Sequence, residues 1–400
     1  MRRRAELSLA GHKTIRLKPR EGRRARAGAP WIFSNEVQMD AAAKALAPGA
    51  VVNVLFDDGH PVGTGYFNPK SLIAVRLLDR ALDTVIGTGF FVRHLERALK
   101  LRGALYPRPF YRLIHAEGDG LPGLALDRFG DTVVAQVTTA GMEALTETLL
   151  RALDKVLAPA NVILRNDAPA RALEGLDNYV RAAKGEMGRV AVEENGVRYL
   201  ADLGIGQKTG WYYDQRDNHA FMASLAKGKS VLDAYSYTGG FGIVAAKAGA
   251  KDVICVDSSA AALALAEESA AANGVAIKAV KADVFEELER LSAAKETFDI
   301  VIADPPPFVR SRKDLEPGAK AYRKLARLAA GVAAKGGYLL LASCSHNIPV
   351  ERFAAECAAG IARAGRSAAL IRQAGAGPDH PVHPMLPETA YLKALVYALD

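Results

Sequence analysis

The chain has 400 residues, of which half are hydrophobic and about a quarter are charged, a composition that excludes an intrinsically disordered protein. At roughly 100–200 residues per domain, we expect three domains. The three cysteines, Cys255, Cys344 and Cys357, are widely spaced and form no CxxC pair, so we expect no disulfide, no metal and a cytoplasmic location. No apolar run is long enough for a signal peptide or a membrane span, so no membrane partner is expected.

Positive charge is concentrated at the N-terminal end. Residues 1–30 hold ten arginines and lysines against two glutamates, and the formal net charge of the whole chain is +8. A block of one sign attracts phosphate-rich partners, which favours nucleic acid. A solvated basic tail, or attraction to a membrane surface, is the alternative.

Short apolar runs broken by turn residues fill residues 14–80. They predict strands at 14–17, 51–56, 62–67 and 73–78, with a hairpin turn at 57–60, and residues 1–82 are assigned to a small all-β domain. Residues 18–22, 31–33, 49–54 and 63–68 of this domain resemble a PUA domain. That resemblance implies binding to structured RNA.

A mixed region follows at residues 83–195. Its periodicity predicts helices at 90–103 and 142–157, and strands at 113–116, 124–129, 132–138 and 162–165. We interpret it as a central α+β domain that connects its neighbours and presents substrate, with a purely structural role as the alternative.

Strands and helices alternate in residues 196–400, which predicts a parallel sheet covered on both faces. The predicted strands are 231–234, 253–256, 277–281, 300–303 and 338–342, and the helices are 243–247, 260–273, 320–334 and 350–364. Strands 368–372 and 391–398 are separated by a loop that is too irregular for a crossover helix, so we expect them to pair antiparallel. The resulting α/β, Rossmann-like, mostly parallel seven-stranded sheet resembles class I methyltransferases.

Acidic residues end three successive strands, where open α/β sheets bind nucleotide-like ligands. Tyr235 and Tyr237 stand where a dinucleotide-binding loop has its first two glycines, which argues against a dehydrogenase. Asp233 suits an ammonium group such as that of methionine, Asp257 suits ribose hydroxyls, and Asp283 suits an adenine amino group. Each could instead be a helix N-cap. The predicted S-adenosylmethionine site comprises Asp233, Ser236, Thr238, Gly239, Phe241, Asp257, Ser258, Asp283, Val284, Asp304 and Arg216.

The segment Asp304-Pro305-Pro306-Pro307-Phe308 ends the predicted strand 300–303. Its prolines fix φ and predict a rigid turn beside the transferred methyl group, with an aromatic ring placed to stack on a base. Residues 207–216, which precede the first strand, are expected to form a polar lid.

In order along nearly the whole chain, six segments resemble bacterial large-subunit ribosomal RNA methyltransferases that methylate cytosine C5 and carry an N-terminal PUA domain. They are residues 207–210 with 214–216, 235–241, 304–308, 343–345, 380–381 and 391–393. The resemblance implies ribosomal RNA as partner and S-adenosylmethionine as cofactor. The chain departs from this family at Asp233, where some members have asparagine, and at Pro307, where lysine is common.

Methylation at cytosine C5 needs a nucleophile, because C5 becomes reactive only after a thiolate adds to C6. Cys344 follows the fifth predicted strand and is the predicted nucleophile, with a structural thiol as the alternative. Cys255 and Cys357 fit packing better. Asp304 is expected to protonate or position N3 of the ring. The base that removes the C5 proton is left open among Asp379, His380 and Glu388.

Two other functions remain open from the sequence. A base N-methyltransferase acting on a purine would use the same Asp-Pro-Pro-x-Phe turn with Cys344 as a structural residue. A non-catalytic RNA-binding assembly factor would keep the fold without turnover. A homodimer is a further open expectation.

Overall fold

The computed structural model describes residues 11–204, 206 and 209–400, and the chain forms two compact units. Among the described residues, the N-terminal unit comprises 11–107, 113–186 and 381–387, and the C-terminal unit comprises 108–112, 187–204, 206, 209–380 and 388–400. Most of the predicted segments 1–82 and 83–195 therefore belong to one unit. Of the basic N-terminal block, Arg2, Arg3 and Arg4 lie outside the described residues, as do Gln207 and Lys208 of the predicted lid. No described helix combines the length and the apolar character that a membrane crossing requires.

The first sheet of the N-terminal unit has five strands in the order β1-β3-β4-β5-β2. Its strands are β1 (Lys13–Arg16), β2 (Trp31–Ile32), β3 (Ala50–Leu55), β4 (Pro61–Phe67) and β5 (Val75–Asp79). The four predicted strands are present, whereas β2 is too short to leave a periodic signal. Two one-turn helices, α1 (Arg23–Arg26) and α2 (Ala41–Lys44), lie between the strands of this β domain.

The second sheet, which belongs to this unit except for residues 110–112 of β6, has the order β10-β9-β8-β7-β6. Its elements are α3 (Thr88–Leu105), β6 (Phe110–His115), β7 (Leu124–Phe129), β8 (Thr132–Val137), α4 (Ala140–Ala144), α5 (Thr146–Leu157), β9 (Asn161–Asn166) and β10 (Tyr179–Lys184). The helix predicted at 142–157 is in fact two helices. The break lies at Leu145, whose φ and ψ of −99° and 2° leave the helical region.

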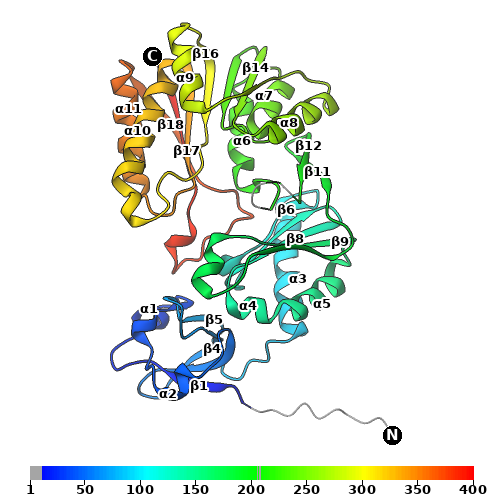
Figure 1. Cartoon of the computed structure of the whole chain (residues 1–400), viewed down its shortest axis with the longest axis vertical. Coiled ribbons are helices and arrows are strands. Elements are labelled where there is room, and N and C mark those ends of the chain that lie inside the picture. Colours follow the sequence, from blue (N-terminus) through cyan, green and yellow to red (C-terminus); the bar gives the residue numbers. More distant parts are fainter. Residues whose placement is uncertain (1–10, 205, 207–208) are drawn as a thin grey trace. The chain divides into compact units, whose positions relative to one another are not determined.

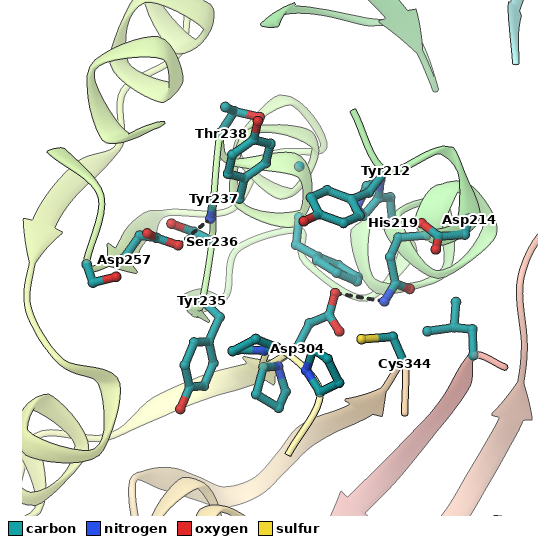
Figure 2. A pocket seen from close by; sticks show the side chains of 18 of the residues that line it. Tyr212, Asp214, His219, Tyr235, Ser236, Tyr237, Thr238, Asp257, Asp304 and Cys344 are labelled. Carbon is teal, nitrogen blue, oxygen red and sulfur yellow. Dashed lines mark hydrogen bonds between the residues drawn. The ribbon is translucent and has the colours of Figure 1, made fainter. Parts of the chain in front are cut away.

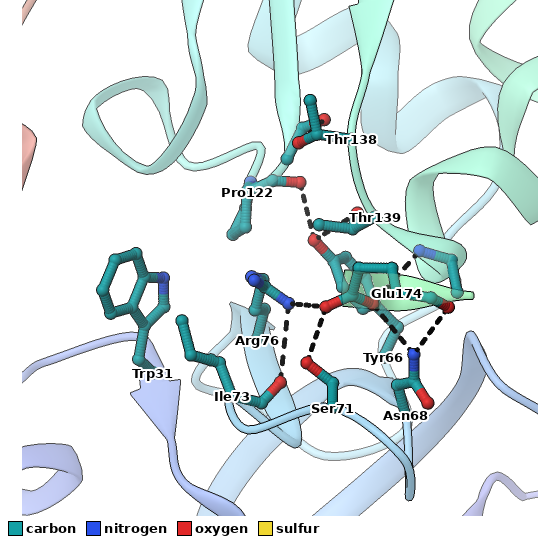
Figure 3. A network of polar contacts seen from close by, with 12 residues as sticks. Trp31, Tyr66, Asn68, Ser71, Ile73, Arg76, Pro122, Thr138, Thr139 and Glu174 are labelled. Atoms are coloured by element: carbon teal, nitrogen blue, oxygen red, sulfur yellow. Dashed lines mark hydrogen bonds and ion pairs between the residues drawn. The ribbon is translucent and has the colours of Figure 1, made fainter. Parts of the chain in front are cut away.

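Glu174 joins these two sheets within the N-terminal unit (Figure 3). Its carboxylate accepts hydrogen bonds from Arg76 at 2.9 Å, Ser71 at 2.7 Å and Asn68 at 3.0 Å. Burial alone would raise the pKa of Glu174, but Arg76 and the hydrogen bonds from Asn68 and Ser71 hold that pKa below its ordinary value. The carboxylate is thus kept charged at the junction.

Aromatic residues reinforce the same junction. Trp31 donates its indole N–H to Glu117 at 2.7 Å, and the Tyr66 hydroxyl donates to the carbonyl of Pro122 at 2.7 Å. Thr139 donates in turn to the Tyr66 hydroxyl at 3.0 Å. Because buried polar networks fix a geometry when every member is satisfied, we expect the two sheets to behave as one body.

The C-terminal unit contains the predicted seven-stranded sheet, in the order β15-β14-β13-β16-β17-β19-β18 (Figure 1). Its strands are β13 (Ser230–Ala234), β14 (Asp252–Asp257), β15 (Lys278–Lys281), β16 (Phe298–Ala303), β17 (Ala333–Ser343), β18 (Ala368–Ala374) and β19 (Lys393–Leu399). Pairings among β13–β17 are parallel, and β19 pairs antiparallel with both β17 and β18. The predicted fold class is confirmed.

Helices cover both faces of this sheet, because apolar side chains point to both sides of its central strands. The helices are α6 (Arg216–Ser224), α7 (Gly240–Lys247), α8 (Ala260–Ala272), α9 (Val284–Ala293), α10 (Leu315–Gly331) and α11 (Val350–Arg363). The helices α9, α10 and α11 share one apolar core with the sheet, and α6, α7 and α8 share the other. The prediction that the helix before β17 extends to residue 334 was wrong, since Ala333 already begins the strand.

A two-stranded hairpin, β11 (Arg189–Glu194) and β12 (Val197–Asp202), precedes the seven-stranded sheet. It was not predicted, although Asn195-Gly196 between two alternating runs is a strong hairpin signal. Both turn residues adopt the left-handed conformation, with φ of 51° and 75°, as the two-residue turn requires.

Candidate active site

A cavity of about 620 Å³ opens at the carboxyl ends of the parallel strands (Figure 2), and its volume is typical of small-molecule sites. Of the predicted residues, Ser236, Thr238, Phe241, Asp257, Ser258, Asp283, Asp304 and Cys344 line it. The lining also includes Trp211, Tyr212, Asp214, Gln215, His219, Tyr235, Tyr237, Gly240, Phe285, Pro305, Pro306, Pro307, Phe308 and Leu392.

The loop between β13 and α7 forms one wall and is conformationally strained. Tyr235 and Tyr237 have φ of 64° and 49°, in the left-handed region that bulky residues rarely adopt. Glycines take these positions in dinucleotide-binding loops, so this loop keeps the unusual backbone and adds two aromatic side chains. Strain of this kind concentrates at functional sites.

Asp257, the last residue of β14, holds this loop in place. One carboxylate oxygen accepts the N–H of Tyr237 at 2.9 Å and the other accepts the N–H of Ser259 at 2.8 Å. A carboxylate has about four acceptor positions, so each oxygen can accept a further hydrogen bond. Asp257 can therefore bind a pair of ribose hydroxyls while it fixes the loop.

Thr238 has a buried hydroxyl group at the wall of the cavity. Its side chain is completely buried, and its hydroxyl finds no hydrogen-bond partner among the described residues although it lines the cavity. Buried hydroxyls are nearly always paired. The Thr238 hydroxyl is therefore available to a polar group of a ligand in the cavity.

Asp283 is a helix N-cap, which was the alternative to its predicted role toward adenine. Its carboxylate caps α9 by accepting the N–H groups of Phe285 at 2.9 Å and Glu286 at 3.2 Å. The residue also lines the cavity. Val284, which was predicted beside it, is buried in the first turn of α9 and does not line the cavity.

Asp233, which was predicted to face an ammonium group, is not among the residues that line the cavity. Its side chain turns beneath the loop and accepts the N–H of Gly242 at 2.8 Å. Burial, supported by the negative charges of Asp304 and Asp257, raises the pKa of Asp233 to about 8. Asp233 thus supports the loop from beneath through its hydrogen bond to Gly242.

Gly239 and Arg216 also lie outside the lining. Gly239 has a φ of 81° and precedes α7, where it allows the sharp entry into the helix. The Arg216 guanidinium donates to the carbonyl of Phe110 and lies 3.4 Å from a carboxylate oxygen of Glu194. Arg216 thus supports residues behind the cavity.

Asp304 projects into the cavity from the end of β16. Its Oδ2 accepts a hydrogen bond from the Gln215 amide at 2.8 Å, drawn in Figure 2. Phe308, at the other end of the proline turn, contacts Tyr322 and Phe285 with ring centroids 4.7 Å and 6.0 Å away. The turn therefore presents a carboxylate and an aromatic edge on a rigid backbone.

Cys344 is the one cysteine of the three that is not buried, and it lines the cavity directly after β17. Hydrogen bonds fix the residues on both sides of it. The Ser343 hydroxyl donates to the Tyr322 hydroxyl at 2.7 Å, which lies 2.9 Å from the Ser345 hydroxyl. Lys393 donates to the carbonyl of Ser345 at 2.6 Å, so an ammonium group lies near the thiol.

The sequence matches two family models, and the residues matched by one of them include those that line the cavity. Residues 15–80 match a PUA-like domain, and residues 178–398, more than half of the chain, match an S-adenosylmethionine-dependent methyltransferase. Ribosomal RNA large subunit methyltransferase I of Shewanella frigidimarina is 37% identical over 96% of this chain and 98% of its own length. The chain belongs to this methyltransferase family.

Solved structures share the fold of the methyltransferase. A candidate S-adenosylmethionine-dependent methyltransferase from Streptococcus mutans has a TM-score of 0.82 at 21% identity, over 96% of this chain and 100% of its own. A candidate methyltransferase solved with S-adenosylhomocysteine (SAH) has a TM-score of 0.83 at 21% identity and the same coverage. The cofactor of the family is S-adenosylmethionine, and the hydroxyl of Thr238 and the carboxylates of Asp257 and Asp283 fit its polar groups.

Several residues of the methyltransferase site were missed from the sequence. His219 on α6 lines the cavity, and its Nδ1 lies 2.6 Å from Glu194, which also accepts the Trp211 indole N–H at 3.1 Å. Asp214, which was predicted only as part of the polar lid, also lines the cavity. Glu194 lies on the overlooked hairpin, so locating the Asn195-Gly196 turn would have pointed toward this cluster.

The candidates for a general base lie elsewhere. Asp379, His380 and Glu388 are not among the residues that line the cavity. Asp379 is completely buried, lies 2.8 Å from Nδ1 of His380 and accepts the N–H of Arg112 at 3.0 Å. This geometry points to a structural role for the Asp379–His380 pair.

Proposed function

We propose that this protein transfers a methyl group from S-adenosylmethionine to C5 of a cytosine in large-subunit ribosomal RNA, through a covalent adduct between Cys344 and C6. The substrate class follows the curated relatives, which are ribosomal RNA large subunit methyltransferases. The target atom rests on one observation: among the three cysteines, Cys344 alone is exposed to the cavity that also receives Asp304.

The strand-end residues would hold the cofactor. Asp257 would accept the ribose hydroxyls, Asp283 would accept the adenine amino group, and Thr238 would pair with a polar group of the cofactor. When bound, S-adenosylmethionine supplies an electrophilic methyl group on a sulfonium. Tyr235 and Tyr237 would exclude water around it, because their side chains fill the loop where smaller residues would leave space.

Cys344 would act as the nucleophile. Its thiolate adds to C6, which makes C5 electron-rich enough to accept a methyl group. The ammonium group of Lys393 lies near this thiol, and a nearby cation favours the thiolate. Burial lowers the pKa of Lys393 and the Cys344 charge opposes that shift, so the two groups are electrostatically linked.

Asp304 would bind the edge of the cytosine ring. In its protonated form it can donate to N3 as the thiolate adds, which neutralises the negative charge that develops on the ring. The hydrogen bond from Gln215 fixes one oxygen of Asp304. This contact orients the carboxyl group before the base arrives, and such preorganisation reduces the barrier.

RNA binding would begin at the N-terminal unit. Its PUA-like region carries basic side chains close together in the sequence, among them Arg16, Lys18, Arg20 and Arg23. Contacts of this kind with phosphates release counterions, so affinity should fall steeply as salt increases.

Release of tritium from C5 tests the target atom directly. Large-subunit ribosomal RNA made with [5-³H]cytidine is incubated with the enzyme and [methyl-¹⁴C]S-adenosylmethionine. We expect one tritium released for each methyl group transferred, and neither event with Cys344→Ser. Methyl transfer without tritium release would place the methyl group on another atom and overturn the proposal.

A further inference from the structure

The chemistry at C5 requires a base, and we propose that Asp214 accepts the C5 proton. This inference rests on the proposed function, since only a C5 methyltransferase releases that proton. Asp214 lines the same cavity as Cys344 and Asp304, whereas none of the three residues suggested by the sequence does. It is also nearly buried, at 4% exposure.

The turn that carries Asp214 already serves the reacting centre. Asp214 and Gln215 are adjacent residues of the short helix η4 (Tyr213–Gln215). Gln215 donates to Asp304 at 2.8 Å, so η4 contacts the group expected at N3, and its Asp214 lines the same cavity. The negative charges of Asp214 and Asp304 both act on the neighbouring Tyr212. Burial raises the pKa of Tyr212 most, and the charges of Tyr237, Asp214, Asp304 and Cys344 raise it further.

Tyr391 fixes the orientation of Asp214. Its hydroxyl donates to Oδ2 of Asp214, and its ring lies against His346 with centroids 5.2 Å apart. Burial, together with the Asp214 charge, raises the pKa of Tyr391 well above its ordinary value, so this hydroxyl stays protonated and remains a donor. A carboxylate has about four acceptor positions, so Asp214 can be held by Tyr391 and still take a proton.

Removal of the C5 proton releases the methylated base from the enzyme. After methyl transfer, C5 carries both the new methyl group and its original hydrogen, and C6 is bonded to Sγ of Cys344. Asp214 takes the C5 proton, and the electron pair of the C5–H bond forms the C5–C6 double bond. The C6–S bond breaks, Cys344 leaves as a thiolate, and the proton that Asp304 donated to N3 returns to Asp304.

Other titratable groups of the cavity are less suited to this step. His219 is held by Glu194 and its ring lies 4.3 Å from that of Phe241, beside the cofactor loop. Asp257 and Asp283 bind backbone N–H groups at the neighbouring strand ends. Asp304 is expected at N3, and the proton to be removed is on C5.

A variant that lacks the base should stop after methyl transfer. Asp214→Asn is incubated with ordinary ribosomal RNA and [methyl-³H]S-adenosylmethionine, and denaturing gels are read for protein-bound label. We expect a labelled RNA–protein adduct at about one per enzyme and a 10²–10⁴-fold slower turnover. Wild type should release its product without accumulating the adduct. The matched control is Asp217→Asn, an exposed residue three positions away that does not line the cavity, and it should behave as wild type.

Wild-type protein with 5-fluorocytosine-containing RNA distinguishes a failure of the proposed C5 mechanism from a failure of the proposed role of Asp214. If wild type forms no adduct with that RNA, the proposed function fails. If wild type forms it but Asp214→Asn turns over ordinary RNA without accumulating adduct, only the role of Asp214 is overturned. If Asp214→Asn no longer binds SAH, Tyr391→Phe is tested in its place, because it removes the hydroxyl that orients Asp214. An RNA–protein adduct that lives longer than in wild type supports the role of Asp214, and an unchanged lifetime overturns it.

Discussion

The carboxyl group of Asp233 makes the stability of the C-terminal unit depend on pH in an unusual direction. Asp233 is completely buried, and its pKa is raised to about 8, whereas an aspartate in an unfolded chain titrates at about 3.9. Between these values the native state keeps a proton that the unfolded state has released. The contribution of Asp233 to the free energy of unfolding therefore falls as pH rises, by about 1.4 kcal/mol per pH unit.

Asp233→Asn removes this titration and keeps an oxygen that can accept the Gly242 N–H. From pH 5 to pH 7, its free energy of unfolding should rise relative to wild type by about 3 kcal/mol. The new amide N–H₂ adds a cost of about 1–3 kcal/mol if left without a partner, but this cost is the same at every pH. Only the change of the stability difference with pH therefore tests the raised pKa of Asp233.

Urea unfolding at fixed ionic strength measures that change. The chain has two tryptophans, and Trp211 lies in the C-terminal unit, so a Trp31→Phe background reports on this unit by fluorescence. Both proteins are unfolded at pH 5, 6, 7 and 8. A stability difference between Asp233→Asn and wild type that stays constant from pH 5 to pH 7 would refute the raised pKa.

Three further outcomes are expected. Asp257→Asn should weaken SAH binding, measured by calorimetry, about 10–100-fold, which is the contribution of a hydrogen bond to a charged group. The control Asp252→Asn, at the opposite end of the same strand, should bind SAH as wild type does. Equal affinities of Asp257→Asn and wild type would exclude the ribose contact. Thr238→Val should weaken SAH binding roughly 2–10-fold and stabilise the ligand-free protein, since it removes a buried unpaired hydroxyl; an unchanged affinity would contradict a ligand contact there. Glu174→Ala should destabilise the N-terminal unit by about 3 kcal/mol in urea unfolding, because Arg76, whose side chain is only 12% exposed, loses its 2.9 Å ion pair and keeps only Glu117 at 3.9 Å. An effect within 0.5 kcal/mol, roughly that of a surface substitution, would contradict the role of this network.

Regular periodicity explains what could be predicted from the sequence. The alternation of apolar strands and helices in residues 196–400 predicted the parallel sheet, and the irregular loop at 374–387 predicted the antiparallel pairing of β18 with β19. Two parallel strands must be joined by a crossover connection, usually a helix. The helices between the earlier strands supply such crossovers, and the loop between β18 and β19 does not. The strand-end position of Asp304 followed for the same reason.

Side-chain direction explains what could not be predicted. The strand that contains Asp233 is buried on both faces, so no alternation of polar and apolar residues reveals which way its carboxyl group points. Asp214 and His219 reach the cavity from η4 and α6, which precede the sheet in the chain, so no strand-end rule locates them. Tertiary packing decides both cases.

The central claim is that Cys344 attacks C6 of a cytosine, and a mechanism-based substrate tests it most directly. Fluorine at C5 cannot be removed as a proton, so the adduct with 5-fluorocytosine cannot collapse after methyl transfer. Wild-type protein, ribosomal RNA containing 5-fluorocytosine and S-adenosylmethionine should yield a covalent complex that survives denaturation, and Cys344→Ala should yield none. A complex that persists in Cys344→Ala, or its absence with wild type, would contradict the mechanism.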